Sequence, residues 1–385
     1  MALPVFSRAL FLLLFLFPIT HQSSPSSEEE CSRTSGRQRS FKLVTDGCNF
    51  TLNEKQKVEI QASTTVLVVP FLYLVAFIVG LPANLLALWV LLFRTKKMPS
   101  TILLINLTSC DLMLLLVLPF RIVYHFSGND WSFGEAFCRM ITALFYGNMY
   151  GSVLCLMLIA MDRYVALVHP FGAKTFRSQR TSFFMSLSVW VVVAAAMAPL
   201  LASRQSYLLN EPPITTCHDA LPAEEQEKFF MPYFITLFSV FFLLPLVLIL
   251  FCYGAVVYTL VTGGRRFAHA IGVTVLVLLV FIVCLLPSNL LLLLHYSDSY
   301  LTGDGDDLYV PYMISLAVST FNSCFDPFIF YYVSEDFRGK VRQALCCQKA
   351  SADSSSGHQA SYSGTKVTLL SKSIRTTGST ENVEA

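Results

Sequence analysis

The stretch AIGVTVLVLLVFIVCLLPSNLLLLL, residues 270–294, carries no charged side chain and is long enough to cross a bilayer as a helix. Because hydrocarbon offers no partner for backbone polar groups, such a run is expected to satisfy its hydrogen bonds within a helix. Six more apolar stretches accompany it, which predicts an all-α membrane protein with a seven-transmembrane helix bundle. The expected spans are 66–93, 101–126, 136–161, 183–202, 229–261, 270–294 and 309–333.

The composition of the whole chain also indicates a membrane protein. Of the 385 residues, 54% are hydrophobic and only 14% are charged, which excludes an ordinary soluble domain. The loops on one side of the expected bundle carry 13 Lys and Arg residues. The loops on the other side, 127–135, 203–228 and 295–308, carry two, beside 11 acidic residues. The positive-inside rule therefore predicts a multi-pass plasma-membrane protein with its N-terminus outside the cell and its C-terminus in the cytoplasm.

Two segments precede the bundle. Residues 1–22 contain a short apolar run after Arg8 and are expected to be a secretory signal peptide, with an uncleaved anchor as the alternative. Residues 23–65 are polar and charged without apolar periodicity, which predicts a disordered extracellular segment. Asn49 begins the triplet Asn-Phe-Thr and is a predicted glycosylation site in this compartment.

Two segments follow the seven-helix domain, 66–333. Residues 334–347 include a basic amphipathic run, which predicts an interfacial helix in contact with membrane lipids. Cys346 and Cys347 follow that run and are predicted palmitoylation sites. Residues 348–385 are rich in Ser and Thr, which is typical of a phosphorylated cytoplasmic tail or of a merely flexible one.

Each expected helix carries one characteristic marker. The third helix ends in Asp162-Arg163-Tyr164. The markers of the first, second, fourth, fifth, sixth and seventh helices are Asn84, Asp111, Trp190, Pro245, Pro287 and Asp326. Together these residues resemble the rhodopsin-like family of G-protein-coupled receptors over about residues 66–347. The resemblance implies that Asp162, Arg163 and Tyr164 form the switch that engages a heterotrimeric G protein, with Arg163 paired to Asp162 at rest. An interfacial anchor is the alternative for these charges.

The same resemblance implies motion and further partners. Pro287 is expected to kink the sixth helix, which swings outward on activation. Arrestin and receptor kinases are implied partners on the cytoplasmic side. The sequence departs from the family pattern at Leu285, where many members have Trp, at Asp326, where Asn is usual, and at Phe330, where Tyr is usual.

The family resemblance also suggests a sodium site in the middle of the bundle. Asp111 would be its centre, because an intramembrane carboxylate needs a partner, a proton or a cation. The expected polar neighbours are Ser152, Asn322, Ser323 and Asp326. A hydrogen-bonded clamp between helices is the alternative for the same residues.

The cysteines are expected to follow the compartment in which they lie. The resemblance pairs Cys138, at the outer end of the third helix, with Cys217 in the largest outer loop, where the environment is oxidising. Cys31 and Cys48 remain in the outer segment and are expected to pair with each other. Apart from the suggested sodium ion, the sequence shows no metal-ligand spacing. It also shows no catalytic constellation, which argues against an enzyme, and no nucleic-acid partner is expected.

A more specific resemblance lies in four short stretches. They are FYGNMY at 145–150, TTCHDAL at 215–221, PSNLLLLLHY at 287–296 and NSCFDPF at 322–328. This set is similar to the proteinase-activated receptors, to subtype 4 most of all, with features of subtypes 1 and 2. That family requires a scissile bond ahead of a ligand built into the same chain, and GRQRSFKLV at 36–44 provides one.

The resemblance implies cleavage after Arg39 by a trypsin-like serine protease, which binds Arg through a buried carboxylate. Whether thrombin is this protease is left open, because residues 40–60 lack the acidic stretch that the exosite of thrombin favours. The alternative is that Arg39 is an ordinary residue of an unstructured tail. Cleavage would expose the tethered ligand Ser40-Phe41-Lys42-Leu43-Val44, whose new ammonium is expected to meet Asp219.

The expected docking site lies at the outer end of the bundle. Besides Asp219, its predicted residues are Tyr124, His218, His295, Tyr296, Tyr309 and Tyr312. The roughly 25 residues between Ser40 and the first expected span would reach about 80 Å if extended. Family resemblance suggests coupling to Gq and a calcium signal. The rival hypothesis is a G-protein-coupled receptor for a diffusible peptide or lipid.

Overall fold

The computed structural model describes residues 41–42, 44–46, 49–52, 54–169, 177–221, 229–262, 268–301 and 308–345. Seven helical stretches are long and apolar enough to cross a membrane, which confirms the predicted bundle. The long helices are α3 (Val69–Phe93), α4 (Pro99–Phe126), α5 (Glu135–Val168), α7 (Gln179–Ala202), α10 (Leu244–Thr262) and α11 (Ala268–Leu301). The fifth span begins with α9 (Met231–Leu237) and a π-helical turn, Phe238–Leu243, and the seventh is α12 (Tyr309–Ser319) with α13 (Asn322–Val333).

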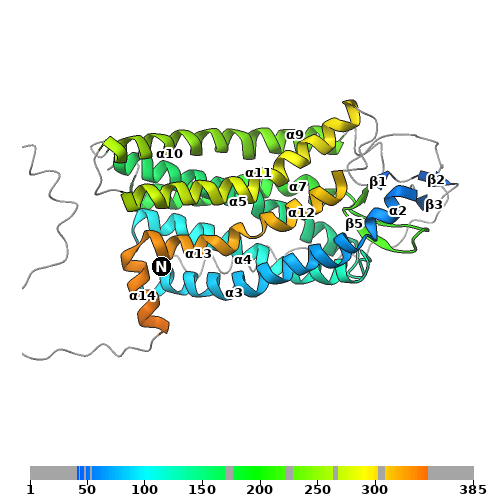
Figure 1. Ribbon diagram of the computed structural model, residues 1–385, viewed down its shortest axis with the longest axis horizontal. Coiled ribbons are helices and arrows are strands. Elements are labelled where there is room, and N and C mark those ends of the chain that lie inside the picture. The colour runs from blue at the N-terminus through cyan, green and yellow to red at the C-terminus, as the bar shows by residue number, and fades with distance from the viewer. Residues whose placement is uncertain are drawn as a thin grey trace, which may run out of the picture. The chain divides into compact units, whose positions relative to one another are not determined.

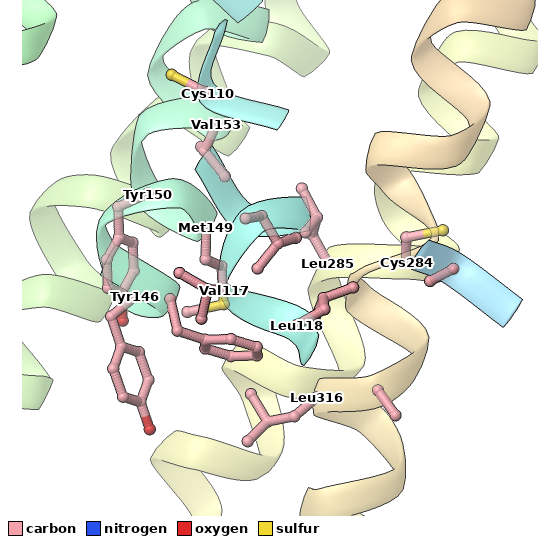
Figure 2. Packing of buried hydrophobic residues seen from close by; sticks show 14 of the residues in the cluster. Cys110, Val117, Leu118, Tyr146, Met149, Tyr150, Val153, Cys284, Leu285 and Leu316 are labelled. Atoms are coloured by element: carbon pink, nitrogen blue, oxygen red, sulfur yellow. The ribbon is translucent and has the colours of Figure 1, made fainter. Parts of the chain in front are cut away.

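Helix α5 forms the centre of the bundle. It packs against α4, α7 and α10, while α11 packs against α10, α12 and α13. Figure 2 shows how side chains from several helices meet there, with Met149 of α5 and Leu285 of α11 in the same cluster. Leu285 is buried, so an aliphatic side chain fills this position, at which the sequence departs from the expected pattern. Many large apolar side chains on the helices are exposed, as contact with lipid requires.

The seventh span is interrupted where no break was expected. Helix α12 ends at Ser319, and α13 starts three residues later. The hydroxyls of Ser319 and Thr320 donate to the backbone carbonyls of Leu316 and Ala317, both at 2.7 Å. Such side-chain bonds compete with the backbone ladder of a helix and explain the local change of geometry. The sixth helix also differs from its predicted end, because α11 continues to Leu301.

The extracellular segment contains more structure than the expected disorder of 23–65. Its described part forms β1 (Phe41–Lys42), β2 (Val44–Asp46), β3 (Asn49–Thr51) and helix α2 (Glu54–Ile60), followed by a π-helical turn at Thr64–Val68. Strands β2 and β3 pair in antiparallel fashion. Figure 1 shows β1 and α2 near β5 (Thr215–Cys217) at one end of the bundle. Asn49 starts β3 and stays a predicted glycosylation site.

Helix α2 is fixed to the bundle by its last turn. Ile60 is fully buried, and its carbonyl accepts a hydrogen bond from the side chain of Asn129. Lys57 forms an ion pair of 2.8 Å with Glu211. The Lys57 ammonium lowers the pKa of the Glu211 carboxyl below its ordinary value. The low apolar periodicity of this segment concealed a helix that depends on these long-range contacts.

Helix α14 (Glu335–Leu345) follows α13 directly, as the interfacial helix was expected to do. Phe330 is buried, and its ring packs edge-on against Phe337 of α14 at a centroid distance of 6.3 Å. Phe330 therefore has a packing role at this position, where the sequence departs from the expected pattern. The neighbouring Tyr331 hydroxyl accepts a hydrogen bond of 3.2 Å from Arg342 Nε. Cys346 and Cys347 lie outside the described residues.

Candidate functional site

The largest outer loop is fixed to α5 by a covalent bond and by hydrogen bonds. Cys138 of α5 and Cys217 form a disulfide, as predicted. Strand β5 pairs in antiparallel fashion with β4 (Ser206–Leu208). At the outer end of α5, the Glu135 carboxylate accepts hydrogen bonds of 2.8 and 2.7 Å from the backbone N–H groups of Gln205 and Ser206. These contacts hold the loop over the bundle.

The loop brings a carboxylate into the outer end of the bundle. Asp219 is only 6% exposed and accepts a hydrogen bond of 2.5 Å from the Tyr124 hydroxyl of α4. Tyr309 of α12 lies beside the same carboxylate. The hydroxyls of Tyr146 and Tyr312 are 2.9 Å apart, which joins α5 to α12.

His218 belongs to the same group of side chains. Its backbone has a positive φ of 70°, and its Nδ1 lies 2.6 Å from Gln205 Oε1. Its ring packs edge-on against Tyr146 at a centroid distance of 5.5 Å. The outer polar cluster, as we call it, consists of Tyr124, Tyr146, His218, Asp219, Tyr309 and Tyr312. The structure thus brings together five of the seven predicted docking residues, while the side chains of His295 and Tyr296 lie outside its described part.

Three buried residues next to this cluster were missed from the sequence. Arg121 and His125 precede and follow Tyr124 on α4, and Tyr73 of α3 stacks on His125 at a centroid distance of 5.9 Å. Arg121 is 6% exposed and places its guanidinium 5.1 Å from the ring centre of Phe145. An arginine inside a membrane span is itself a sign of a functional site, and that sign was available in the sequence.

The backbone of the predicted ligand lies beside the outer loop. Strand β1 pairs in parallel with β6 (Ala220–Leu221), in the register Phe41 to Ala220 and Lys42 to Leu221. Leu221 is fully buried, so the edge that β1 pairs with is held firmly. The predicted cleavage residues Arg39 and Ser40, the ligand residue Leu43 and the expected pair Cys31 and Cys48 lie outside the described residues.

The polar core of the bundle contains the residues predicted for sodium. Ser323 donates a hydrogen bond of 2.8 Å to Asp111 Oδ1, and Asn84 donates one of 2.7 Å to the Ser323 carbonyl. These bonds join α3, α4 and α13 as the predicted clamp would. Asn322 Nδ2 is 3.2 Å from Asp326 Oδ2.

The same core was predicted to hold a small cation. Asp111 Oδ2 is buried, and the described residues give it no hydrogen-bond partner. A cavity of about 10 Å³, near the size of one water, is lined by apolar side chains such as Leu114, Met149 and Leu285 and by polar ones that include Ser152, Asn322 and Ser323, while Asp111 is not part of its lining. Carboxylate, hydroxyl and amide oxygens are the ligands that hard cations prefer. In the described part of the chain, no group of three His, Cys, Asp or Glu side chains is arranged to hold a metal ion.

Near the C-terminal end of α5, Asp162 has a different partner from the one expected. Its Oδ1 accepts a hydrogen bond of 2.8 Å from Arg177, which lies just before α7. The expected partner was Arg163, but Arg163 follows Asp162 directly in the helix, and adjacent residues of a helix do not face each other. The Tyr164 hydroxyl lies 2.9 Å from His169 Nε2. Among the described residues, the partner of Asp162 is therefore provided by the segment before α7 and not by the Asp162-Arg163-Tyr164 motif.

Comparison with known proteins identifies the family. Residues 83–330 match the family described as 7 transmembrane receptor (rhodopsin family). The chain is 50% identical to human proteinase-activated receptor 4 over 277 residues, 72% of each chain, and 46% identical to the rat protein over 324 residues, 82% of each. It is 39% identical to human proteinase-activated receptor 3 over 275 residues, 71% of this chain and 73% of the relative. The chain belongs to the proteinase-activated receptors, a family of rhodopsin-like receptors and not of enzymes.

Proposed function

We propose that this protein is a plasma-membrane receptor switched on by proteolysis. A trypsin-like serine protease, with thrombin one candidate, cuts after Arg39, and the new N-terminus at Ser40 docks against the outer polar cluster. Docking favours a state with α11 moved outward, which activates a heterotrimeric G protein of the Gq class and raises cytoplasmic calcium. Receptor kinases and arrestin then act on the cytoplasmic side.

The register between β1 and β6 is the observation that carries this proposal. Phe41 is paired with Ala220, the residue after Asp219. In the proposed complex the cut ligand continues this parallel pairing by one residue, so that its new N-terminus meets Asp219. Strand addition to an exposed edge is a common way to bind a peptide, because main-chain hydrogen bonds provide affinity. Cleavage would add a charged amine at the position that faces the buried carboxylate. The uncut chain has a neutral peptide bond there.

Because α2 is anchored to the bundle, the segment that connects the ligand to its anchor point is shorter than the sequence predicted. Residues 41–53 alone separate Ser40 from α2, and at about 3.3 Å per residue they reach about 43 Å. This is an upper limit, because β2 and β3 of this segment pair with each other, and a short tether presents its end at an effective concentration in the millimolar range. Even a weakly binding peptide would therefore occupy its site once it is cut free.

The central test replaces the residue before the scissile bond. Arg39→Ala is expected to abolish the calcium response to trypsin while leaving the response to free Ser-Phe-Lys-Leu-Val peptide unchanged. Arg37→Ala is the matched control and should keep both responses, because it removes an arginine of the same segment from a different bond. N-terminal sequencing of the treated wild-type receptor should begin at Ser40.

Each other outcome points to a different conclusion. A full response of Arg39→Ala to trypsin would overturn cleavage at this bond. A wild-type receptor that ignores the free peptide would overturn the built-in ligand and favour a receptor for a diffusible peptide or lipid.

A further inference from the structure

Arg121 combines deep burial with an incomplete set of partners. It lies one helical turn before Tyr124 on α4, so both side chains share a face of that helix. Its guanidinium stacks on Phe145, and the residue is 6% exposed. The described residues offer no hydrogen-bond acceptor to its Nε. A buried cation with an unsatisfied donor is costly, and an apolar side chain at this position would avoid that cost.

The surroundings place Arg121 at the outer polar cluster. Its charge acts on Tyr73, His125 and Tyr309, and Asp219 acts on Tyr73 and Tyr309 as well. Yet among the described residues Arg121 forms no ion pair with Asp219 within 4.0 Å. The cluster thus presents one negative and one positive side chain, each near the same tyrosines and each separate from the other.

The chemistry of the predicted ligand limits what Arg121 could bind. The segment Ser40-Phe41-Lys42-Leu43-Val44 contains no carboxylate, and its C-terminal end continues into the chain. Its hydrogen-bond acceptors are therefore backbone carbonyls and the Ser40 hydroxyl. Strand pairing with β6 directs only part of the carbonyls of an extended segment to that edge, and the others point the opposite way.

We propose that Arg121 is a ligand-recognition residue whose guanidinium donates hydrogen bonds to a backbone carbonyl of the docked segment 40–44. The proposal rests on the proposed function, in which that segment binds at the outer polar cluster. Asp219 then holds the ammonium at the start of the ligand, while Arg121 holds the backbone behind it. Recognition by two opposite charges fixes the direction of the peptide, because reversing it would place each charge against the wrong group.

The first measurement is the potency of free Ser-Phe-Lys-Leu-Val peptide on Arg121→Gln. A hydrogen bond from a charged donor contributes enough for a loss of roughly tenfold to a hundredfold. Arg204→Gln is the matched control, because Arg204 is an outer-loop arginine that stacks on Tyr207 at 4.8 Å. It should keep wild-type potency. Arg121→Lys should recover part of the loss, and surface expression measured by antibody binding should be equal in all variants.

A second measurement separates direct contact from a structural role. Peptides in which one carbonyl oxygen at a time is replaced by sulfur keep each N–H donor but have a weak acceptor at that bond. We expect one such peptide to lose potency on the wild-type receptor and to show at least about fivefold less additional loss on Arg121→Gln. Additive losses for every bond would overturn the role of Arg121, although the peptide would still activate. Failure of the unmodified peptide on the wild-type receptor would instead overturn the proposed function.

Discussion

Replacing Asp219 by Asn removes a buried charge and leaves most of the surrounding geometry in place. The amide oxygen of the new side chain can still accept the hydrogen bond that Tyr124 donates to Asp219 at 2.5 Å. What is lost is the ion pair with the ammonium of the docked ligand. Since Asp219 is only 6% exposed, solvent screens that pair weakly. Truncating a buried charge pair costs about 2–5 kcal/mol, so the peptide concentration for half-maximal response should rise at least about thirtyfold.

The assay is the calcium response to free Ser-Phe-Lys-Leu-Val peptide, normalised to surface expression. Glu211→Gln is the matched control: it changes the same charge on the same loop, but the Glu211 side chain is 72% exposed. Solvent and salt screen an exposed ion pair strongly, so its shift should stay below about fivefold. An N-acetylated peptide lacks the ammonium and should be weak on the wild type but no weaker on Asp219→Asn. Equal potency of Asp219→Asn and wild type for the free-amine peptide would refute the ion pair.

Two further predictions concern the bundle. An added Cβ at Gly80 would lie 2.8 Å from Leu115 Cδ2, so Gly80→Ala should destabilise the purified receptor by about 1–3 kcal/mol, measured by thermal denaturation. Gly254→Ala meets nothing within 4 Å and should leave stability unchanged or raise it; equal effects of the two would contradict close helix packing. Asp162→Asn breaks a contact worth about 1 kcal/mol and should raise ligand-independent phosphoinositide signalling about fivefold, whereas unchanged basal signalling would argue against a resting lock.

The helices could be predicted because the bilayer imposes a single rule on every span. Each apolar run must satisfy its own backbone bonds, so length and composition suffice to find it. The ends of the helices follow other rules. The break after Ser319 depends on hydroxyls that bond to their own helix, and α2 depends on contacts with residues far along the chain, such as Asn129. Neither leaves a periodic signal in the local sequence.

The candidate site was predictable only in part, for a similar reason. Resemblance to a family predicted the Cys138–Cys217 disulfide, and five of the seven residues that it assigned to docking lie together in the structure. Partners that meet through folding were missed: Arg177 replaces Arg163 beside Asp162, although nothing in the spacing indicates it. A charged residue inside a predicted membrane span indicates a functional site even where no spacing pattern does, and Arg121 is an example.

The strand pairing changes the account of why cutting one bond would switch the receptor. If the ligand were far from its site before cleavage, the tether would have to bring it there. The backbone of Phe41 and Lys42 instead pairs with the outer loop in a chain whose Arg39–Ser40 bond is intact. The backbone of Phe41 and Lys42 therefore lies beside the loop before cleavage, so its approach to the loop cannot by itself be what activates the receptor. Under the proposed function the remaining signal is charge, because hydrolysis of the Arg39–Ser40 bond would turn a neutral amide into an ammonium that Asp219, a weakly screened carboxylate, could bind. Activation would then follow from electrostatics at the end of a strand that is already in register.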